Sequence, residues 1–472
     1  MKSITGALGL VLGLVVSTAV MGGEPAPGPS GRGALARLEG DWDGKLDAGA
    51  IKLRIILHVH NRDGAAEATI DSPDQNAIGL PATVTLTGDR VSLSAQGAPG
   101  AFEGDLSPDG ASLAGQWSGA PLTFVRRAPG AAAPVLNRPQ TPEKPYPYRE
   151  EMVAYDNAAA HVRLTGTLTL PRGPGPFPAV VLIAGSGAHA RDETIFGHAV
   201  FLVLADHLTR HGIAVLRYDK RGLGGSGGDP ATATSRDFAS DAEAGVAFLK
   251  TRPEIDPRRI GLIGHSEGGV IAPMVAGEDP SVAFLVLMAG SAVPGDQIIM
   301  AQTRAIAAAA GAPEAVVEAN AVVERKFLDA VMAAKDRASA EAAARAVLKA
   351  AGLPDAAIEA QARAASSDWY RFFLAYDPAP ALRGLRRPVL AVIGSKDLQV
   401  PAALNLPAFR AALKSDPDAE ILELSGLNHL FQTARTGAPS EYGEIEETFS
   451  PTALDVITDW ILERAKRPAE GG

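Results

Sequence analysis

Cysteine is absent from all 472 residues of the chain. Its absence excludes disulfides, thiolate metal sites and a cysteine nucleophile in a single step. It also excludes a lipoprotein, because there is no cysteine to acylate. The chemistry and the stability of this protein must therefore come from other side chains.

Positive charge is also scarce. The chain has 44 Lys and Arg against 54 Asp and Glu, a formal net charge of −10, and no basic stripe runs along it. Binding to nucleic acid requires clustered Lys and Arg, so a nucleic-acid surface is not expected. The hydrophobic share of 46% and the charged share of 21% are ordinary for a folded soluble protein.

The first 23 residues predict a secretory signal peptide. A single charge at Lys2 precedes an apolar run over residues 7–21, and small residues follow at Gly22 and Gly23. An uncleaved membrane anchor is the alternative, although the run is slightly short for a spanning helix. We therefore expect a periplasmic or secreted protein with no stable membrane insertion after cleavage.

The length of the chain predicts more than one domain. Residues 24–37 read as a linker rich in Pro and Gly. Residues 38–127 show short alternating runs separated by turns, for example over residues 51–59, which predicts a small antiparallel sandwich or barrel. A second linker, rich in Pro and Ala, covers residues 128–147.

Strand-like and helix-like runs alternate in the remainder of the chain, residues 148–472. Such alternation predicts a mainly parallel sheet with helices on both faces. Over about residues 294–380 the pattern gives way to Ala, Glu, Arg and Val with no strand signal. We expect a helical insertion there, placed where a lid could cover a site. The predicted fold class is α/β, preceded by a small all-β domain.

Ser266 lies in the stretch around which this second region is organised. A short apolar strand over residues 260–263 turns sharply through Gly-His-Ser-Glu-Gly and enters a helix at about residue 270. This geometry holds a serine up as a nucleophile. A second Gly-x-Ser-x-Gly, around Ser226, lies beyond its strand with no helix after it, so turn formation explains it better.

A serine hydroxyl is a weak nucleophile at neutral pH and needs a base and a group that orients the base. Active sites of parallel sheets lie beyond the carboxyl ends of the strands. Among the nine His, only His429 follows Ser266, and it comes directly after an apolar run, as does Asp397. The chain order Ser266, Asp397, His429 is the one that this elbow requires, so we predict a catalytic triad.

Two backbone donors are also needed for the oxyanion. The N–H of Glu267 would supply the first, and the loop after residues 180–183 the second, from Ser186 or Gly187. An ordinary glycine turn is the alternative for that loop. The role of the Glu267 side chain is left open, and a pairing of its carboxylate with Arg191 or Arg217 is one hypothesis.

Two further groups of side chains receive a plainer interpretation. His58 and His60 share one face of a predicted strand, but no third ligand is apparent, so neither a metal nor a cofactor is predicted. Aromatic residues at the end of the insertion fit its interior better than an acyl pocket at their helical spacing: Trp369, Tyr370, Phe372 and Phe373.

Taken together, these motifs resemble those of the α/β-hydrolases, and more narrowly of the EstD-type secreted esterases, close to those labelled serine aminopeptidase-like hydrolases. The resemblance covers roughly residues 150–466 and is carried by residues 184–187 with 191–193, 217–222, 264–269, 394–401 and 428–432. It implies that Ser266 is the nucleophile, Asp397 the orienting acid, His429 the base, and Ser186 with Glu267 the oxyanion donors. Ala184 stands where the wider superfamily often has a His-Gly pair, which leaves the second donor open.

We therefore predict a serine esterase that cleaves short to medium acyl esters through an acyl-enzyme on Ser266. A peptidase or acyl-aminopeptidase of the same fold is the first alternative, with Glu267 as the only hint of a subsite for a free amino group. A catalytically silent envelope binding protein, with the β domain as its working part, is the second. A separate expectation is that the β domain shields or positions the active site.

Overall fold

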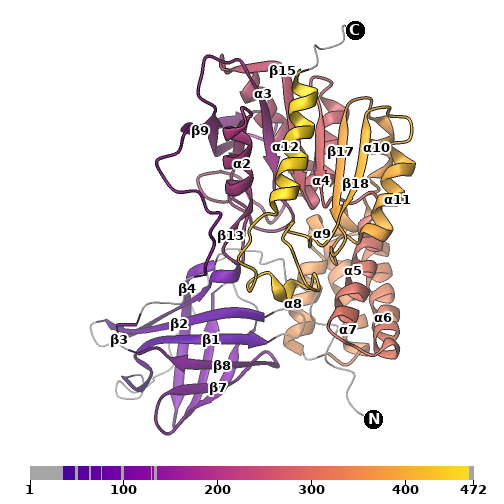
Figure 1. The fold of residues 1–472 in the computed structure, drawn as a ribbon. Helices are drawn as coiled ribbons and strands as arrows, with labels where there is room; N and C mark the ends of the chain where they lie inside the picture. Colours follow the sequence, from indigo (N-terminus) through magenta and orange to yellow (C-terminus); the bar gives the residue numbers. More distant parts are fainter. Residues whose placement is uncertain are drawn as a thin grey trace.

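The computed structural model describes residues 36–47, 52–62, 65–75, 77–96, 100–128, 130–131, 136–353 and 355–466. The predicted signal peptide and nearly all of the first predicted linker lie outside these residues. No helix in the described ranges is long and apolar enough to cross a membrane. The chain forms a β-barrel followed by a larger α/β unit (Figure 1).

Eight antiparallel strands close the barrel, so the predicted β domain is confirmed and its form is a barrel. β1 pairs with both β2 and β8, which leaves no free edge in the ring. Leu57 and Val59 point into the barrel and are buried, whereas His58 between them faces outward. The strands are β1 (Gly40–Asp47), β2 (Lys52–Arg62), β3 (Ala65–Ser72), β4 (Ala77–Thr87), β5 (Arg90–Ala95), β6 (Phe102–Leu106), β7 (Ser112–Trp117) and β8 (Ala120–Arg126).

The α/β unit is built on an eight-stranded sheet of order β18-β17-β16-β15-β11-β14-β10-β9. From β18 to β14 the neighbouring strands are parallel, and β10 and β9 add an antiparallel edge. The predicted, mainly parallel sheet is thus confirmed. Its strands are β9 (Arg149–Asn157), β10 (Val162–Leu170), β11 (Phe177–Ile183), β14 (Ala214–Tyr218), β15 (Ile255–His265), β16 (Leu285–Met288), β17 (Val389–Gly394) and β18 (Ala419–Leu424).

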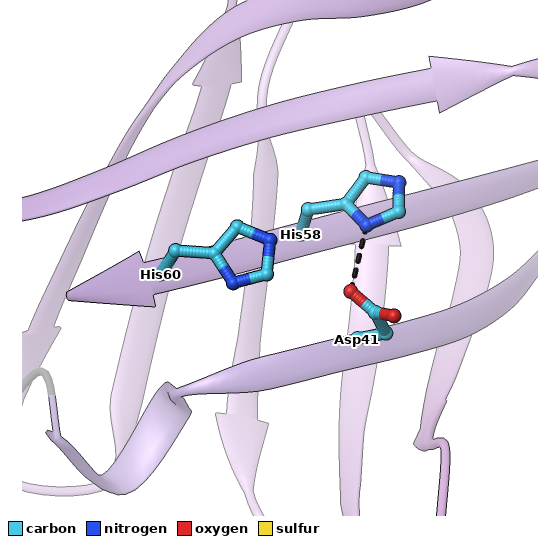
Figure 2. Close-up of side chains that lie close together, drawn as sticks. All are labelled: Asp41, His58 and His60. Carbon is cyan, nitrogen blue, oxygen red and sulfur yellow. Dashed lines mark hydrogen bonds and ion pairs between the residues drawn. The ribbon is translucent and has the colours of Figure 1, made fainter. Parts of the chain in front are cut away.

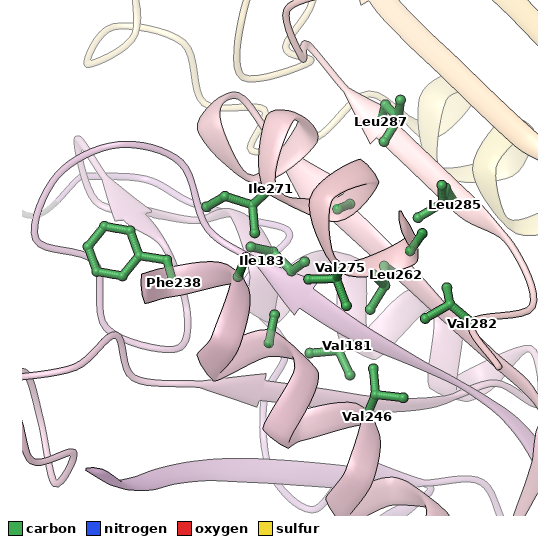
Figure 3. Close-up of a cluster of buried hydrophobic side chains, with 14 of the residues drawn as sticks. Val181, Ile183, Phe238, Val246, Leu262, Ile271, Val275, Val282, Leu285 and Leu287 are labelled. Carbon is green, nitrogen blue, oxygen red and sulfur yellow. The ribbon is translucent and has the colours of Figure 1, made fainter. Parts of the chain in front are cut away.

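Successive residues of the central strands feed two separate cores, because side chains alternate across a sheet. Val181 and Ile183 belong to the core under α3 (Ser235–Lys250), α4 (Glu267–Glu278), α10 (Ala379–Gly384) and α11 (Ala402–Ala412). Part of this core is drawn in Figure 3. Val180 and Leu182 belong to the core under α2 (Val200–Arg210) and α12 (Pro451–Lys466) on the opposite face. Near-continuous apolar strands of this kind are typical of a sheet covered on both sides.

Of the six helices described between β16 and β17, the first five share a core of their own. They are α5 (Gly295–Ala309), α6 (Glu314–Ala333), α7 (Arg337–Ala350), α8 (Asp355–Ala365) and α9 (Asp368–Ala375). We call them the helical insertion. Figure 1 places the helical insertion and the barrel at the same end of the α/β unit.

The barrel contacts the α/β unit through a short segment that follows β11. The 3-10 helix η3 (Pro73–Gln75) lies against β12 (Thr194–Ile195), which forms a small hairpin with β13 (His198–Ala199). The N–H of Phe196 donates to the carbonyl of Asp74 at 3.0 Å. Leu53 of β2 packs on a cluster formed by Phe196, Leu430 and Tyr442.

Candidate active site

Ser266 lies between the end of β15 and the start of α4, as the sequence predicts for a nucleophile elbow. Its backbone angles are φ 55° and ψ −116°, a region that non-glycine residues rarely adopt. The N–H of Ser266 donates to the carbonyl of Met288 at 2.8 Å, which ties the turn to the neighbouring strand. The strained turn lifts the side chain above the edge of the sheet.

Two glycines make this turn possible because they let backbone segments meet. A Cβ on Gly264 would lie 2.0 Å from the carbonyl oxygen of Gly268, and a Cβ on Gly268 would lie 2.0 Å from that of Ile183. No larger residue fits at either position without moving the main chain. The Gly-x-Ser-x-Gly spacing around Ser266 is therefore a packing requirement.

Asp397 and His429 meet after β17 and β18. The Nδ1 atom of His429 lies 2.9 Å from Oδ2 of Asp397, and both side chains are buried. The other oxygen of Asp397 accepts from the N–H groups of Gln399 and Val400 at 2.9 and 2.8 Å. Because a carboxylate only accepts, Nδ1 of His429 carries the proton and Nε2 is left as a base.

His429 is close to the elbow in space. Its carbonyl oxygen lies 3.0 Å from Nε2 of His265, the residue before Ser266. The rings of His265 and His429 have centroids 5.0 Å apart. The structure thus gathers Ser266, Asp397 and His429 at the carboxyl edge of one sheet.

The loop after β11 lies directly beside Ser266. A Cβ on Gly185 would lie 3.2 Å from Cβ of Ser266. The carbonyl of Gly185 accepts from Nζ of Lys220 at 2.6 Å, and that of Ser186 contacts Nε2 of His189 at 2.8 Å. In a trans peptide the N–H points opposite to the carbonyl, so the N–H groups of Ser186 and Gly187 point away from these partners.

Glu267 does not pair with Arg191 or Arg217, so that hypothesis is wrong. Its Oε2 lies 3.3 Å from Nζ of Lys220, and its Oε1 accepts from Oγ of Ser235 and Nε1 of Trp369, each at 2.7 Å. Sequence spacing alone could not reveal Lys220, which comes two residues after β14, a strand that β11 separates from β15. The position of this lysine, just beyond the carboxyl end of a strand, is the sequence feature that could have indicated its contact with Glu267.

Arg191 and Arg217 form ion pairs with acidic residues other than Glu267. Arg191 forms an ion pair with Asp219, with Nη2 2.5 Å from Oδ2, and Arg217 pairs with Asp192. Asp219 also accepts from the hydroxyl of Thr165 at 3.0 Å. These pairs fix the loops after β11 and β14, and they leave Lys220 as the cation nearest to Glu267.

The serine of the second Gly-x-Ser-x-Gly forms hydrogen bonds with backbone groups. The hydroxyl of Ser226 donates to the carbonyl of Asp219 at 2.8 Å and accepts from the N–H of Thr165 at 3.0 Å. With both hydrogen-bonding roles filled, Ser226 links the loop after β14 to β10. These hydrogen bonds agree with the expectation that the motif around Ser226 forms a turn.

A cavity opens above Ser266 between the sheet and the helical insertion. The insertion supplies mostly apolar walls, and polar groups gather at the elbow. Trp369 and Phe373 stack with ring centroids 5.5 Å apart and line this cavity as well as the core of the insertion. We expected these aromatic residues to lie in the interior of the insertion and not in a pocket, but Trp369 and Phe373 belong to both. The lining residues are Ser186, Ser266, Glu267, Val270, Ser291, Ile298, Ile299, Gln302, Trp369, Tyr370, Phe373, Gln399 and Val400.

The histidine pair on the barrel has the third neighbour that the sequence did not reveal. Asp41, on the adjacent strand β1, lies beside His58 and His60, and one ligand atom of each falls within 4.8 Å of the others (Figure 2). Both ring nitrogens of His58 already contact carboxylates, Asp41 at 2.7 Å and Asp71 at 3.1 Å. Arg127 lies 3.2 Å from Asp41. Hydrogen bonds and ion pairs thus account for Asp41 and His58.

Comparison with known proteins places the site in a family context. Residues 180–438 match the model of the "Alpha/beta hydrolase family". Esterase EstD of Thermotoga maritima is 28% identical over 305 residues, which are 64% of this chain and 66% of that esterase, just under two thirds of its length. Thiohydrolase apmlB of Arthrinium phaeospermum is 43% identical over 88 residues, 18% of this chain and 27% of that protein. Among solved structures, an esterase of Pyrococcus furiosus aligns with 71% of this chain and 100% of its own, at 15% identity and a TM-score of 0.43.

Proposed function

Because the chain belongs to the alpha/beta hydrolase family, we propose that it is a serine esterase that cleaves carboxylic esters through an acyl-enzyme on Ser266. The observation that carries this proposal is the contact of 2.9 Å between His429 and Asp397, at the strand ends beside the strained elbow of Ser266. It fixes the imidazole tautomer that can take a proton from a serine.

The proposed reaction uses three side chains and two backbone N–H groups of the chain. Oγ of Ser266 attacks the ester carbonyl carbon while Nε2 of His429 takes the serine proton, and Asp397 stabilises the imidazolium. The N–H groups of Glu267 and of Ser186 or Gly187 hold the oxyanion. Collapse breaks the bond to the alcohol, which leaves with the proton from His429. Water, activated by the same histidine, then releases the acid and restores Ser266.

The walls of the cavity favour an apolar acyl or alcohol group of modest size. Ile298, Trp369 and Phe373 of the helical insertion face the elbow across it. We therefore propose short to medium acyl esters as the substrate class and a lid role for the insertion. Hydrolysis rates across p-nitrophenyl esters of increasing acyl length measure this preference. A rate that keeps rising with long chains would contradict it.

The test of the proposed nucleophile is Ser266→Ala. Turnover of a p-nitrophenyl ester should fall on the order of 10⁶-fold if the triad works as a unit. Ser226→Ala is the control, since Ser226 has the same sequence motif but bonds to the backbone, and it should retain the wild-type rate constant per folded molecule. Unchanged activity in Ser266→Ala would defeat the assignment.

The peptidase alternative loses its main support in the surroundings of Glu267. A subsite for a free amino group needs a carboxylate with oxygens to spare, whereas Lys220, Ser235 and Trp369 already contact both oxygens of Glu267. Amino-acid arylamides should therefore be poorer substrates than matched esters. Faster hydrolysis of the arylamides would favour the peptidase.

The silent binding protein remains the alternative from a different class. A fluorophosphonate probe labels a serine only when the nucleophile and its base are assembled. We expect labelling of the folded wild type and none of Ser266→Ala. Absence of label on the folded wild type would favour the binding protein.

We also propose export through cleavage of a signal peptide near residue 23. Amino-terminal sequencing of the protein from the periplasm or the medium of expressing cells should give a sequence that begins close to Glu24. Recovery of the intact amino terminus in the cytosol would contradict export.

A further inference from the structure

Two buried ionisable side chains beside the site have no part in the mechanism proposed above. Glu193 follows the loop after β11 and is 0% exposed, and His265 precedes Ser266 and is 1% exposed. Oε1 of Glu193 lies 3.0 Å from Nδ1 of His265. Groups of this kind are costly to bury unless they are paired and hydrogen-bonded.

The ring of His265 is charged, because each of its nitrogens faces an acceptor. Nδ1 meets the carboxylate of Glu193, and Nε2 meets the carbonyl oxygen of His429 at 3.0 Å. Two acceptors require two N–H donors, which only the imidazolium has. Burial alone would lower the pKa of His265, but the charge and hydrogen bond of Glu193 outweigh burial and raise that pKa.

The same oxygen of Glu193, Oε1, also contacts the loop after β11. It accepts from the N–H of Gly185 at 2.6 Å, while Lys220 holds the carbonyl of Gly185. Oε2 of Glu193 has no hydrogen-bond partner among the described residues, so Oε1 alone carries both contacts. The backbone of Glu193 has φ 44°, a strained conformation for a non-glycine residue.

We propose that the Glu193–His265 ion pair is a positioning device for the reaction. It holds the loop after β11, which carries the expected oxyanion donors, at a fixed position relative to the backbone of His429. The proposal rests on the proposed function. One end of the pair holds Gly185, next to the expected donor Ser186, and the other holds the main chain of His429. A buried ion pair is a poor way to stabilise a fold, since desolvation offsets its attraction. Aligned donors and a fixed base, in contrast, act directly on the rate.

The test replaces each member by a neutral side chain of similar size, Glu193→Gln and His265→Gln. We expect kcat on a p-nitrophenyl ester to fall about 10- to 100-fold in each, because displacement of catalytic groups by about 1 Å can cost about 100-fold. KM should stay within about 3-fold, because the pair does not touch the cavity. The double variant should lose no more than the worse single variant, since both break one unit.

His198→Gln is the matched control. His198 is equally buried, and its nitrogens contact the hydroxyl of Thr448 and the carbonyl of Tyr442, each at 2.9 Å. It should lower the melting temperature while kcat stays within about 3-fold of wild type. If Glu193→Gln and His265→Gln behave like this control, or if their losses multiply in the double variant, the proposal is overturned.

A measurement on the wild type keeps the proposal testable if the variants do not fold. Nitrogen-15 NMR of labelled histidine should show a doubly protonated ring for His265 at neutral pH, and a neutral ring would overturn the proposal. Failure of the proposed function looks different. It appears as a wild type without esterase activity, or as an active Ser266→Ala, whatever the ring of His265 shows.

Discussion

Asp397 uses its two carboxylate oxygens for different tasks. One accepts from the backbone N–H groups of Gln399 and Val400, and so fixes the carboxylate in its loop. The other meets His429. The orientation of the proposed base is therefore set by a side chain that is itself held by its own loop, which is the arrangement a general base requires.

Asp397→Asn separates these two tasks. The amide oxygen can still accept from the backbone, but the amide N–H₂ would face Nδ1 of His429 and favour the wrong tautomer. We expect kcat to fall about 10⁴-fold with little change in the melting temperature. Steady-state kinetics and thermal unfolding monitored by circular dichroism check both parts. A loss of activity below about tenfold would remove Asp397 from the triad.

At the residue scale, the positions of the proposed triad were predictable and their supporting contacts were not. Ser266, Asp397 and His429 each follow an apolar run, and their order in the chain limits the choice. Glu193 and His265 have no local pattern that joins them, because their contact depends on how two neighbouring strands end. The suggested partners of Glu267 were wrong because their contacts also depend on how strands end. Arg191 and Arg217 form ion pairs with Asp219 and Asp192 instead.

Among the elements, α9 and α4 are joined by one hydrogen bond between the helical insertion and the elbow. Nε1 of Trp369 donates to Oε1 of Glu267 at 2.7 Å, while the indole ring stacks on Phe373. Trp369→Phe keeps an aromatic wall and removes the donor. We expect the free energy of unfolding to fall by about 1–3 kcal/mol, measured by urea denaturation, because a buried carboxylate loses a partner.

Trp460→Phe is the comparison for this prediction. Nε1 of Trp460 is buried and has no hydrogen-bond partner among the described residues, so its removal breaks no hydrogen bond. Both replacements lose similar volume, and the difference between them isolates the hydrogen bond of Trp369. Equal losses of stability in the two variants would show that this bond contributes nothing.

Inside the helical insertion, α6 carries a buried acid that makes stability depend on pH. Burial raises the pKa of Glu324 from its ordinary value of 4.5 to about 7, although the charge of Arg325 opposes this. The folded protein thus binds the proton more tightly than the unfolded chain. Stability from this group is complete below about pH 4.5 and is lost as pH rises to about 7, a loss of about 3 kcal/mol.

Glu324→Gln removes this titration. The free energy of unfolding of the variant, relative to wild type, should increase from pH 5 to pH 8 in urea denaturation. Glu318→Gln on the same helix is the control, because Glu318 is exposed and pairs with Arg304. A wild type with the same pH dependence as Glu324→Gln would contradict the raised pKa of this carboxyl.

Strands with few apolar residues are difficult to delimit from the sequence. β1 reads Gly-Asp-Trp-Asp-Gly-Lys-Leu-Asp, with Trp42 as its single fully buried large side chain. β7 and β9 are similarly polar, and they form because neighbouring strands offer hydrogen bonds to their backbones. The apolar strands of the parallel sheet were predictable, because burial on two faces leaves a continuous hydrophobic run.

Over the whole molecule, the barrel contacts the loop that holds the proposed base. Leu53 of β2 packs on a cluster that includes Leu430, the residue after His429. The barrel also holds the segment that follows Glu193, through the bond from Phe196 to Asp74. These contacts support the hypothesis that the barrel positions the active site.

Leu53→Asp tests that hypothesis in the full-length chain. A charge in this apolar contact should loosen the loop and lower kcat about 10-fold or more. Val125→Asp is the control, because Val125 is 56% exposed on the outer face of the same barrel. Full catalytic rates in Leu53→Asp would count against a positioning role for the barrel.

The place of the helical insertion also has a consequence for the biogenesis of the protein. Leu285 of β16 pairs with Val389 of β17, so six helices must be made before the sheet can be extended beyond β16. A chain that emerges amino terminus first therefore exposes Ser266 long before Asp397 and His429 exist. Such distant pairings form slowly. If the proposed function is correct, hydrolysis can start only when the last two strands have joined the sheet, and the order of synthesis itself then keeps the nascent chain inactive.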